Sequence, residues 1–191
     1  MTTTAYIVRH APADFSLEQF HTRPLSERGR NASLQVCKVL QTEPIDHIVS
    51  SASPCAVQTV EPLAHALSIA IETHDDLREL LLRGTEYHLD ESDVEPAIAY
   101  MFANPDYALP GGESRRMCEA RAIPVFQKIL QAHAGKHIVL AGHGICLTLL
   151  LASYDSSFDF SFWQRMTKPD VYRAEFSGDA LVSCDRIPLH E

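Results

Sequence analysis

Two histidines follow apolar runs of the chain, and both could do chemistry on a phosphate group. The run that starts at Ala5 ends in Arg9-His10, and the run at 136–141 is followed by His143 between two glycines. A neutral imidazole nitrogen can act as a nucleophile, and a guanidinium offers a planar fork of donors that matches phosphate oxygens. These residue types suit phosphoryl transfer through a phosphohistidine: one imidazole attacks phosphorus, while the other imidazole and the arginine neutralise the equatorial oxygens.

The elements that must position these histidines alternate along the chain. β-Branched and apolar runs predict strands, and the stretches between them predict helices, with Ser26 and Ser53-Pro54 as N-terminal signals. The predicted strands are 5–10, 45–50, 69–73, 136–141, 171–176 and 180–184. The predicted helices begin after residue 26 and after residue 53, and three more lie at 94–103, at 114 to about 134 and at 145–151. Alternation of this kind predicts an α/β fold, a three-layer sandwich whose mostly parallel central sheet has helices on both faces. Ligands then bind outside the carboxyl ends of the strands, where both histidines lie.

Length and composition limit the classes of protein to consider. With 191 residues we expect a single domain, 1–191, in which the less regular stretch at about 80–110 forms a lid-like excursion. Sixteen basic against 25 acidic residues give a net charge of −9, and the sequence contains no run of basic residues. This balance argues against nucleic acid and anionic membranes as partners, so a phosphate site must be built locally.

Targeting signals and cysteines indicate the compartment. No signal peptide is visible at the start, and the longest uncharged apolar run, around 145–152, is too short to span a membrane. The five cysteines are odd in number and widely spaced, as expected for reduced thiols. We therefore expect a cytoplasmic protein.

Six short blocks in this chain, taken together, resemble those of the histidine phosphatase superfamily, the phosphoglycerate-mutase-like proteins. The blocks are 7–11, 24–29, 50–51 with Gln58-Thr59, 77–79, 110–114 with Arg121, and 141–144. The resemblance implies a phosphoglycerate-mutase-like fold. It also implies that His10 is the phosphorylated nucleophile, Arg9 the first phosphate-binding arginine and His143 the second histidine of the phosphate pocket.

The proton donor for the leaving oxygen is also implied by the resemblance. Glu79 matches the acid of the family's Leu-x-Glu block. Glu113, in the Pro-Gly-Gly-Glu-Ser block, is the reserve acid and an expected part of the phosphate site. The alternatives are a solvated carboxylate at Glu79 and a first-turn glutamate favoured by the helix dipole at Glu113.

One position departs from the family pattern. The family carries a second clamp arginine three residues before the glutamine that Gln58 matches, and this chain has Cys55 there. Losing one charged hydrogen bond, about 1.5–3 kcal/mol, could weaken phosphate handling roughly tenfold to a hundredfold. Restoring an arginine should then strengthen oxyanion binding, unless another arginine has taken the place. The candidates for such a replacement are Arg23, Arg83, Arg115 and Arg116.

Two other kinds of site find little support. A cysteine phosphatase needs an arginine six residues after its nucleophile, and none of the five cysteines has one; Cys55 has Glu61. A glycine between His133 and His137 breaks the helical spacing of a metal-ligand pair. We expect no metal and no cofactor, and Cys55 is interpreted as a small buried residue or, through the helix N-terminus, a reactive thiol.

The first functional hypothesis is a metal-independent phosphatase that acts on a small phosphorylated molecule or a phosphohistidine. The alternative is a catalytically weak member that binds a phosphorylated ligand or a protein partner, because Cys55 replaces the clamp arginine. A phosphoglycerate-type mutase is third, since the cofactor-dependent mutases that the chain resembles are longer. The residues that select the substrate are expected in the 80–110 excursion.

Overall fold

The computed structural model describes residues 1–14 and 22–189. Within them, six strands form one mixed sheet in the order β3-β2-β4-β1-β5-β6. The four parallel strands are β1 (Thr2–Arg9), β2 (His47–Ser51), β3 (Ile71–His74) and β4 (His137–Gly142). Two antiparallel strands, β5 (Asp170–Ser177) and β6 (Ala180–Arg186), extend the sheet beyond β1.

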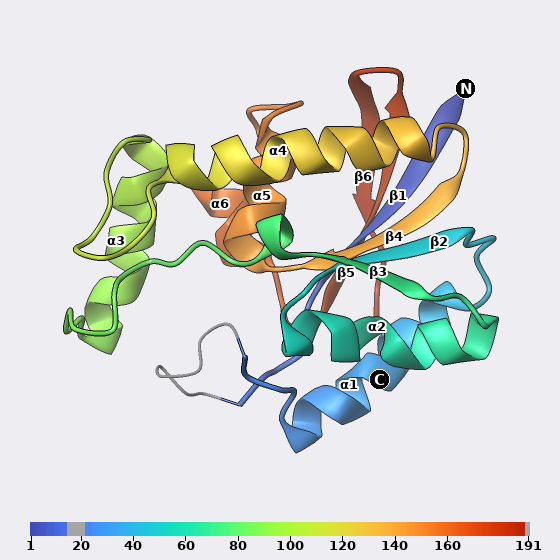
Figure 1. Cartoon of the computed structure of the whole chain (residues 1–191), viewed down its shortest axis with the longest axis horizontal. Coiled ribbons are helices and arrows are strands. Elements are labelled where there is room, and N and C mark those ends of the chain that lie inside the picture. The colour runs from blue at the N-terminus through green and yellow to red at the C-terminus, as the bar shows by residue number, and fades with distance from the viewer. Residues whose placement is uncertain (15–21, 190–191) are drawn as a thin grey trace.

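Helices cover both faces of this sheet (Figure 1). One face carries α1 (Glu27–Leu40) and α2 (Pro54–Leu67), and the other carries α4 (Arg115–Ala132) and α5 (Gly144–Ala152). Two further helices, α3 (Glu91–Ala103) and α6 (Phe160–Arg165), pack beside α4 and α5. The predicted three-layer α/β sandwich is therefore confirmed.

β1 lies between β4 and β5 and contributes to both cores. Ala5 and Ile7 face the core formed with α4 and α5, whereas Tyr6 and Val8 face the core formed with α1 and α2. A strand covered on both faces needs apolar side chains at every position, which explains its unbroken apolar run. This burial fixes the position of β1, and hence of the two polar residues at its carboxyl end.

The sequence missed one helix. The central part of the aromatic stretch at 158–166 forms α6, with Phe162 buried. The Asp159 side chain caps this helix by accepting a hydrogen bond from the Phe162 N–H, a signal that the sequence did contain. Among the described residues, no helix has the length and apolar character needed to cross a membrane.

The loop after β1 is tied to the starts of α1 and α2. The Pro12 carbonyl accepts hydrogen bonds from the N–H and hydroxyl of Ser26, which caps α1 as predicted. The Ala11 N–H donates to Thr59 Oγ1 at 2.9 Å. A Cβ on Gly29, one turn into α1, would lie 1.9 Å from the Pro12 oxygen. Only glycine therefore allows α1 to approach this loop.

We predict that Gly29→Ala lowers the free energy of unfolding by at least about 1–3 kcal/mol, because the added methyl group must displace backbone. Urea unfolding followed by circular dichroism measures the change. Asn31→Ala, on the exposed side of the same helix, is the matched control and should leave stability unchanged or slightly raised. Equal stability of the two variants would contradict the tight contact between Gly29 and Pro12.

Candidate functional site

The pairing of β1 with β4 brings the two histidines together. Arg9 and Gly142 are partners in the parallel register, so the residue that follows each of them leaves the sheet at the same edge. The His10 N–H donates to the Gly142 carbonyl at 2.9 Å. The rings of His10 and His143 have their centroids 5.2 Å apart at an interplanar angle of 60°. Both residues are buried, each with 3% of its surface exposed.

His10 is held as a neutral imidazole with a defined tautomer. Its Nδ1 lies 2.7 Å from the Ala11 carbonyl oxygen. A carbonyl can only accept, so Nδ1 carries the hydrogen and Nε2 carries the lone pair. Burial, followed by the neighbouring His143, lowers the pKa of His10 well below its usual value. His10 therefore presents an unprotonated Nε2 at neutral pH, the form in which an imidazole can attack an electrophile.

Arg9 is a buried cation beside this pair. Its Nη1 donates to the Met166 carbonyl at 2.8 Å. A Cβ on Gly144 would lie 2.9 Å from Cζ and Nη2 of Arg9, so this glycine provides the space that the guanidinium fills. Burial lowers the pKa of Arg9, and the carboxylates of Glu79 and Asp170 oppose that effect.

The end of β2 supports the second histidine. Nε2 of His143 lies 2.9 Å from Oγ of Ser51, the last residue of β2. The Ser51 hydroxyl also accepts from the Ser53 N–H at 3.3 Å, next to the start of α2. Ser51 is fully buried, and this contact fixes the orientation of the His143 ring. The Ser50-Ser51 block singled out in the sequence therefore has a positioning role in the structure.

Glu79 lies at the N-terminus of α5, beside the same site. Its Oε1 accepts hydrogen bonds from the N–H groups of Cys146, at 2.9 Å, and Leu80, at 3.0 Å. Its Oε2 accepts from the Ile145 N–H at 3.1 Å. The contacts with Ile145 and Cys146 satisfy N–H groups at the start of α5. They hold the Glu79 carboxylate against the residues that follow His143 in the chain. Its electrostatic interaction with Arg9 places it at the pocket.

Glu113 has a different set of partners. Its carboxylate accepts from Arg121 at 2.8 and 2.9 Å and from Arg78 at 3.1 Å. Burial alone would raise the pKa of Glu113, but the hydrogen bonds from Arg121 and the Leu81 N–H lower it overall. An ionised carboxylate has no donor for an oxyanion, so these contacts do not support the expected phosphate contact of Glu113. They favour Glu79 over Glu113 as the proton donor, and that role stays a prediction.

Cys55 lies in the first turn of α2 and faces the two histidines. Its side chain is 1% exposed, and its Sγ lies within 4.8 Å of a ring nitrogen of His10 and of His143. Burial raises the pKa of the Cys55 thiol, in spite of a nearby cation, Arg23. The helix start therefore does not make Cys55 a readily ionised thiol, in contrast to the reactive alternative.

Most of the arginines proposed to replace the missing clamp are held elsewhere. Arg83 donates to the backbone carbonyls of Gly84 and Tyr87, Arg115 pairs with Glu119, and Arg116 pairs with Asp106. Arg23 is the exception, because it interacts electrostatically with both Cys55 and Lys168. Of the four candidates, only Arg23 therefore contributes positive charge next to Cys55.

Lys168 is a site residue that the sequence did not reveal. It lies between α6 and β5, and its charge acts on His10 and on Cys55. Although the residue as a whole is exposed, desolvation lowers the pKa of its ammonium, and the neighbouring Arg9 and Arg23 lower it further. A single lysine in a loop gives no motif, so only the fold shows that this cation joins the pocket.

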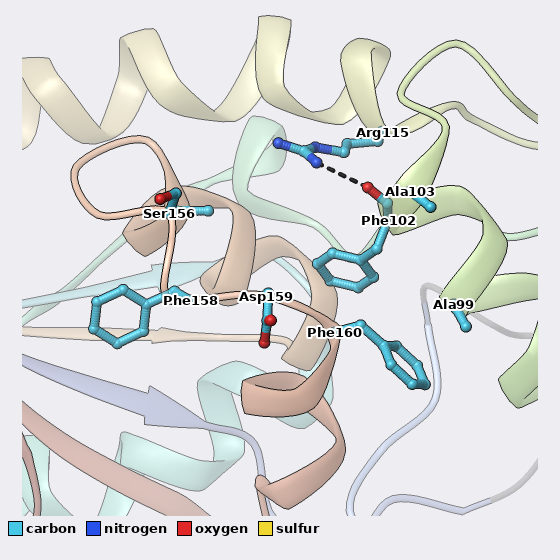
Figure 2. Close-up of a pocket in the computed structure, with 9 residues that line it drawn as sticks. Ala99, Phe102, Ala103, Arg115, Ser156, Phe158, Asp159 and Phe160 are labelled. Atoms are coloured by element: carbon cyan, nitrogen blue, oxygen red, sulfur yellow. Dashed lines mark hydrogen bonds between the residues drawn. The ribbon is translucent and has the colours of Figure 1, made fainter.

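A separate cavity of about 320 Å³ lies among the helices beside α4 and α5 (Figure 2). Its walls come from α3, the start of α4 and the loop before α6, and they include Phe102, Phe158 and Phe160. Arg115 borders the cavity while its Nη1 donates to the Phe102 carbonyl at 2.9 Å. The Phe160 ring stacks on Trp163 with centroids 5.6 Å apart, and Trp163 Nε1 lies beside Gly144. This aromatic pair connects the cavity wall with the surroundings of Arg9.

Comparisons with known proteins agree with this geometry. A probable phosphoglycerate mutase GpmB of Salmonella choleraesuis is 27% identical over 156 residues, which are 78% of this chain and 73% of that protein. Bacillus stearothermophilus YhfR has a TM-score of 0.75 at 25% identity and covers 94% of each chain. The mycobacterial glucosyl-3-phosphoglycerate phosphatase has a TM-score of 0.76 at 20% identity, with 97% of each chain covered. Residues 5–182 match the family model of the histidine phosphatase superfamily (branch 1). The chain therefore belongs to the histidine phosphatase superfamily.

Proposed function

We propose that this protein is a phosphatase that hydrolyses a small phosphorylated molecule or a phosphohistidine, without a metal, through a phosphohistidine on His10. The observation that carries the proposal is the neutral His10 ring, whose Nε2 lone pair is held beside His143 and the buried cation Arg9. This arrangement provides a nucleophile and the positive charge that a transferring phosphoryl group needs.

The reaction takes place in two steps. His10 Nε2 attacks phosphorus, the bond from phosphorus to the leaving oxygen breaks, and Glu79 in its protonated form gives that oxygen a proton. A water molecule then attacks the phosphohistidine, the P–N bond breaks, and the Glu79 carboxylate takes the proton from the water. The carboxylate is suited to both tasks because three backbone N–H groups fix its orientation.

Local charge supports oxyanion binding in an otherwise acidic protein. The chain has a net charge of −9, yet Arg9, Lys168 and Arg23 bring positive charge to one pocket. Arg9 Nε is also a buried donor that has no hydrogen-bond partner among the described residues. An unpaired buried donor is costly, and a phosphate oxygen would satisfy it.

The names of similar proteins favour a small phosphorylated substrate. The mycobacterial neighbour is a glucosyl-3-phosphoglycerate phosphatase, and structures of it contain VO3 or inorganic phosphate. The Salmonella relatives are named as probable phosphoglycerate mutases, so a mutase is the second candidate. A mutase returns the phosphoryl group of His10 to a second hydroxyl, and its turnover should require a bisphosphorylated sugar acid.

The first prediction concerns the nucleophile. In EDTA, the wild-type protein should hydrolyse p-nitrophenyl phosphate, and His10→Asn should lose at least about a thousandfold in kcat, since no other side chain forms the intermediate. His65→Asn, an exposed histidine on α2, is the matched control and should retain wild-type activity. Equal activity of wild type and His10→Asn would disprove the mechanism. Phosphate binding by calorimetry with no turnover of any phosphoester would instead support the weak, ligand-binding alternative.

A second prediction separates the two glutamates. Glu79→Gln should lower kcat about 10²–10⁴-fold for substrates with poor leaving groups, and much less for p-nitrophenyl phosphate, whose leaving group hardly needs a proton. Glu113→Gln removes an ion-pair partner of Arg121 and should lower activity without this dependence on the leaving group. A plot of log kcat against leaving-group pKa for both variants shows which glutamate donates the proton. If the dependence followed Glu113 and not Glu79, the assignment of the acid would have to be reversed.

The third prediction concerns the cation that replaces the missing arginine. Lys168→Met should weaken binding of inorganic phosphate about tenfold to a hundredfold, the scale of one charged hydrogen bond, as measured by calorimetry. The pKa of Lys168 is lowered, so this lysine loses its charge at a lower pH than an exposed lysine does. The phosphate affinity of the wild-type protein should therefore fall as the pH rises through that range, whereas Lys168→Arg should keep its affinity to higher pH.

Two further variants complete this test. Lys128→Met, which removes an exposed charge on α4, is the control and should leave phosphate affinity unchanged. In the Lys168→Met background, Cys55→Arg should recover affinity, whereas in the wild-type background the added guanidinium meets Lys168 and Arg23 and should gain little. A large gain in the wild-type background would show that the clamp position is electrostatically empty.

A further inference from the structure

The cysteine that departs from the family pattern forms a cluster with the two histidines. One ligand atom each of His10, Cys55 and His143 lies within 4.8 Å of the other two, and all three residues are buried. They come from three separate elements: the ends of β1 and β4 and the first turn of α2. One thiolate and two imidazoles form a donor set that Zn²⁺ binds in proteins.

We propose that Cys55, His10 and His143 bind Zn²⁺ in the space that the phosphoryl group would occupy. Three protein ligands leave a fourth tetrahedral position for water. Binding of the metal does not depend on the proposed phosphatase activity. Its consequence does rest on that function: a zinc ion on His10 takes up the nucleophilic nitrogen, so the metal and a phosphate ester exclude each other.

The geometry is close to that of a zinc site. With Zn–N bonds of 2.0–2.1 Å and Zn–S bonds of about 2.3 Å, tetrahedral ligand atoms lie roughly 3.3–3.6 Å apart. The present separations of up to 4.8 Å therefore need to shrink by at most about 1.2–1.5 Å, which side-chain rotation can supply. The Nδ1–H of His10 already donates to the Ala11 carbonyl, the outer contact that a metal-binding histidine needs.

The charges around the cluster favour binding in one respect and oppose it in another. Arg9, Lys168 and Arg23 repel a cation, and the buried Cys55 must lose its proton when the metal binds. The thiolate that forms and the nearby Glu79 carboxylate offset the positive charge, since Glu79 interacts with both Arg9 and Cys55. An arginine at position 55, as in the family pattern, would instead add a fourth cation and no lone pair. The replacement that removes a clamp for anions thus provides the third metal ligand.

Cobalt provides a direct test, because Co²⁺ bound to a thiolate has a sulfur-to-metal charge-transfer band. We expect one equivalent of Co²⁺ to give this band in the reduced full-length protein, with visible bands typical of tetrahedral coordination, and Zn²⁺ to displace it. Cys55→Ser should abolish the charge-transfer band and weaken Zn²⁺ binding at least about a hundredfold, since even loss of an outer contact costs about 10–100-fold. Cys37→Ser and Cys184→Ser, half-buried thiols elsewhere, are the controls and should keep the band.

The result that would overturn the proposal is the absence of a thiolate–cobalt band in the wild-type protein, or an undiminished band in folded Cys55→Ser. Circular dichroism checks the fold, and Cys55→Ala, which suits the small neighbours Ala11 and Ala32, is the second variant. The wild-type spectrum can overturn the zinc site without any variant.

The two proposals fail separately. A Cys55-dependent band in a protein without phosphatase activity would support the zinc site and contradict the proposed function. Phosphatase activity that depends on His10, in a protein without any thiolate–cobalt band, would support the proposed function and contradict the zinc site. Where both hold, Zn²⁺ should raise the apparent KM for p-nitrophenyl phosphate in proportion to its concentration and leave kcat unchanged, as expected for competition at one site.

Discussion

The whole site depends on the parallel pairing of β1 with β4. This pairing sets Arg9 opposite Gly142, so that His10 and His143 leave the sheet side by side and the His10 N–H bonds to the Gly142 carbonyl. A slip by one residue would turn every side chain of β1 to the other face and place its apolar residues in the wrong core. Because β1 packs into both cores, such a slip is strongly disfavoured. The stability of the sheet and the geometry of the histidine pair therefore rest on the same register.

Burial gives the site its chemistry as well as its shape. The low exposure of His10 keeps its imidazole neutral, while Arg9 stays at the same depth because Glu79 and Asp170 supply negative charge. The low dielectric strengthens each of these interactions. Glu79 does two things at once: it caps the start of α5 and balances the charge of Arg9. Removing this carboxylate would therefore change the environment of Arg9 and His10 as well as the proposed supply of protons.

The sequence predicted those features that neighbouring residues encode. Strand ends, the Ser26 cap and the layered α/β fold follow from local patterns, and the structure brings Arg9, His10, His143 and Glu79 to one place. Contacts between distant segments were not predictable. Lys168 reaches the pocket only because the loop after α6 folds back towards β1, and no motif surrounds it. The ion pair of Arg78 with Glu113 likewise joins segments that lie far apart in the chain.

The character of the pocket turns on position 55 because it faces both histidines at a buried helix start. A guanidinium there would add a fixed charge, and the pocket would favour dianions. A thiol changes the balance in two ways: the anion then depends on the neighbouring cations Lys168 and Arg23, and the two imidazoles gain a neighbour with a lone pair. Cys55 packs against Ala11 and Leu25 in a small apolar cluster of its own, on α2 and outside the sheet. One side chain can thus redirect a preformed pair of histidines between an anion and a metal without altering the sheet that holds them.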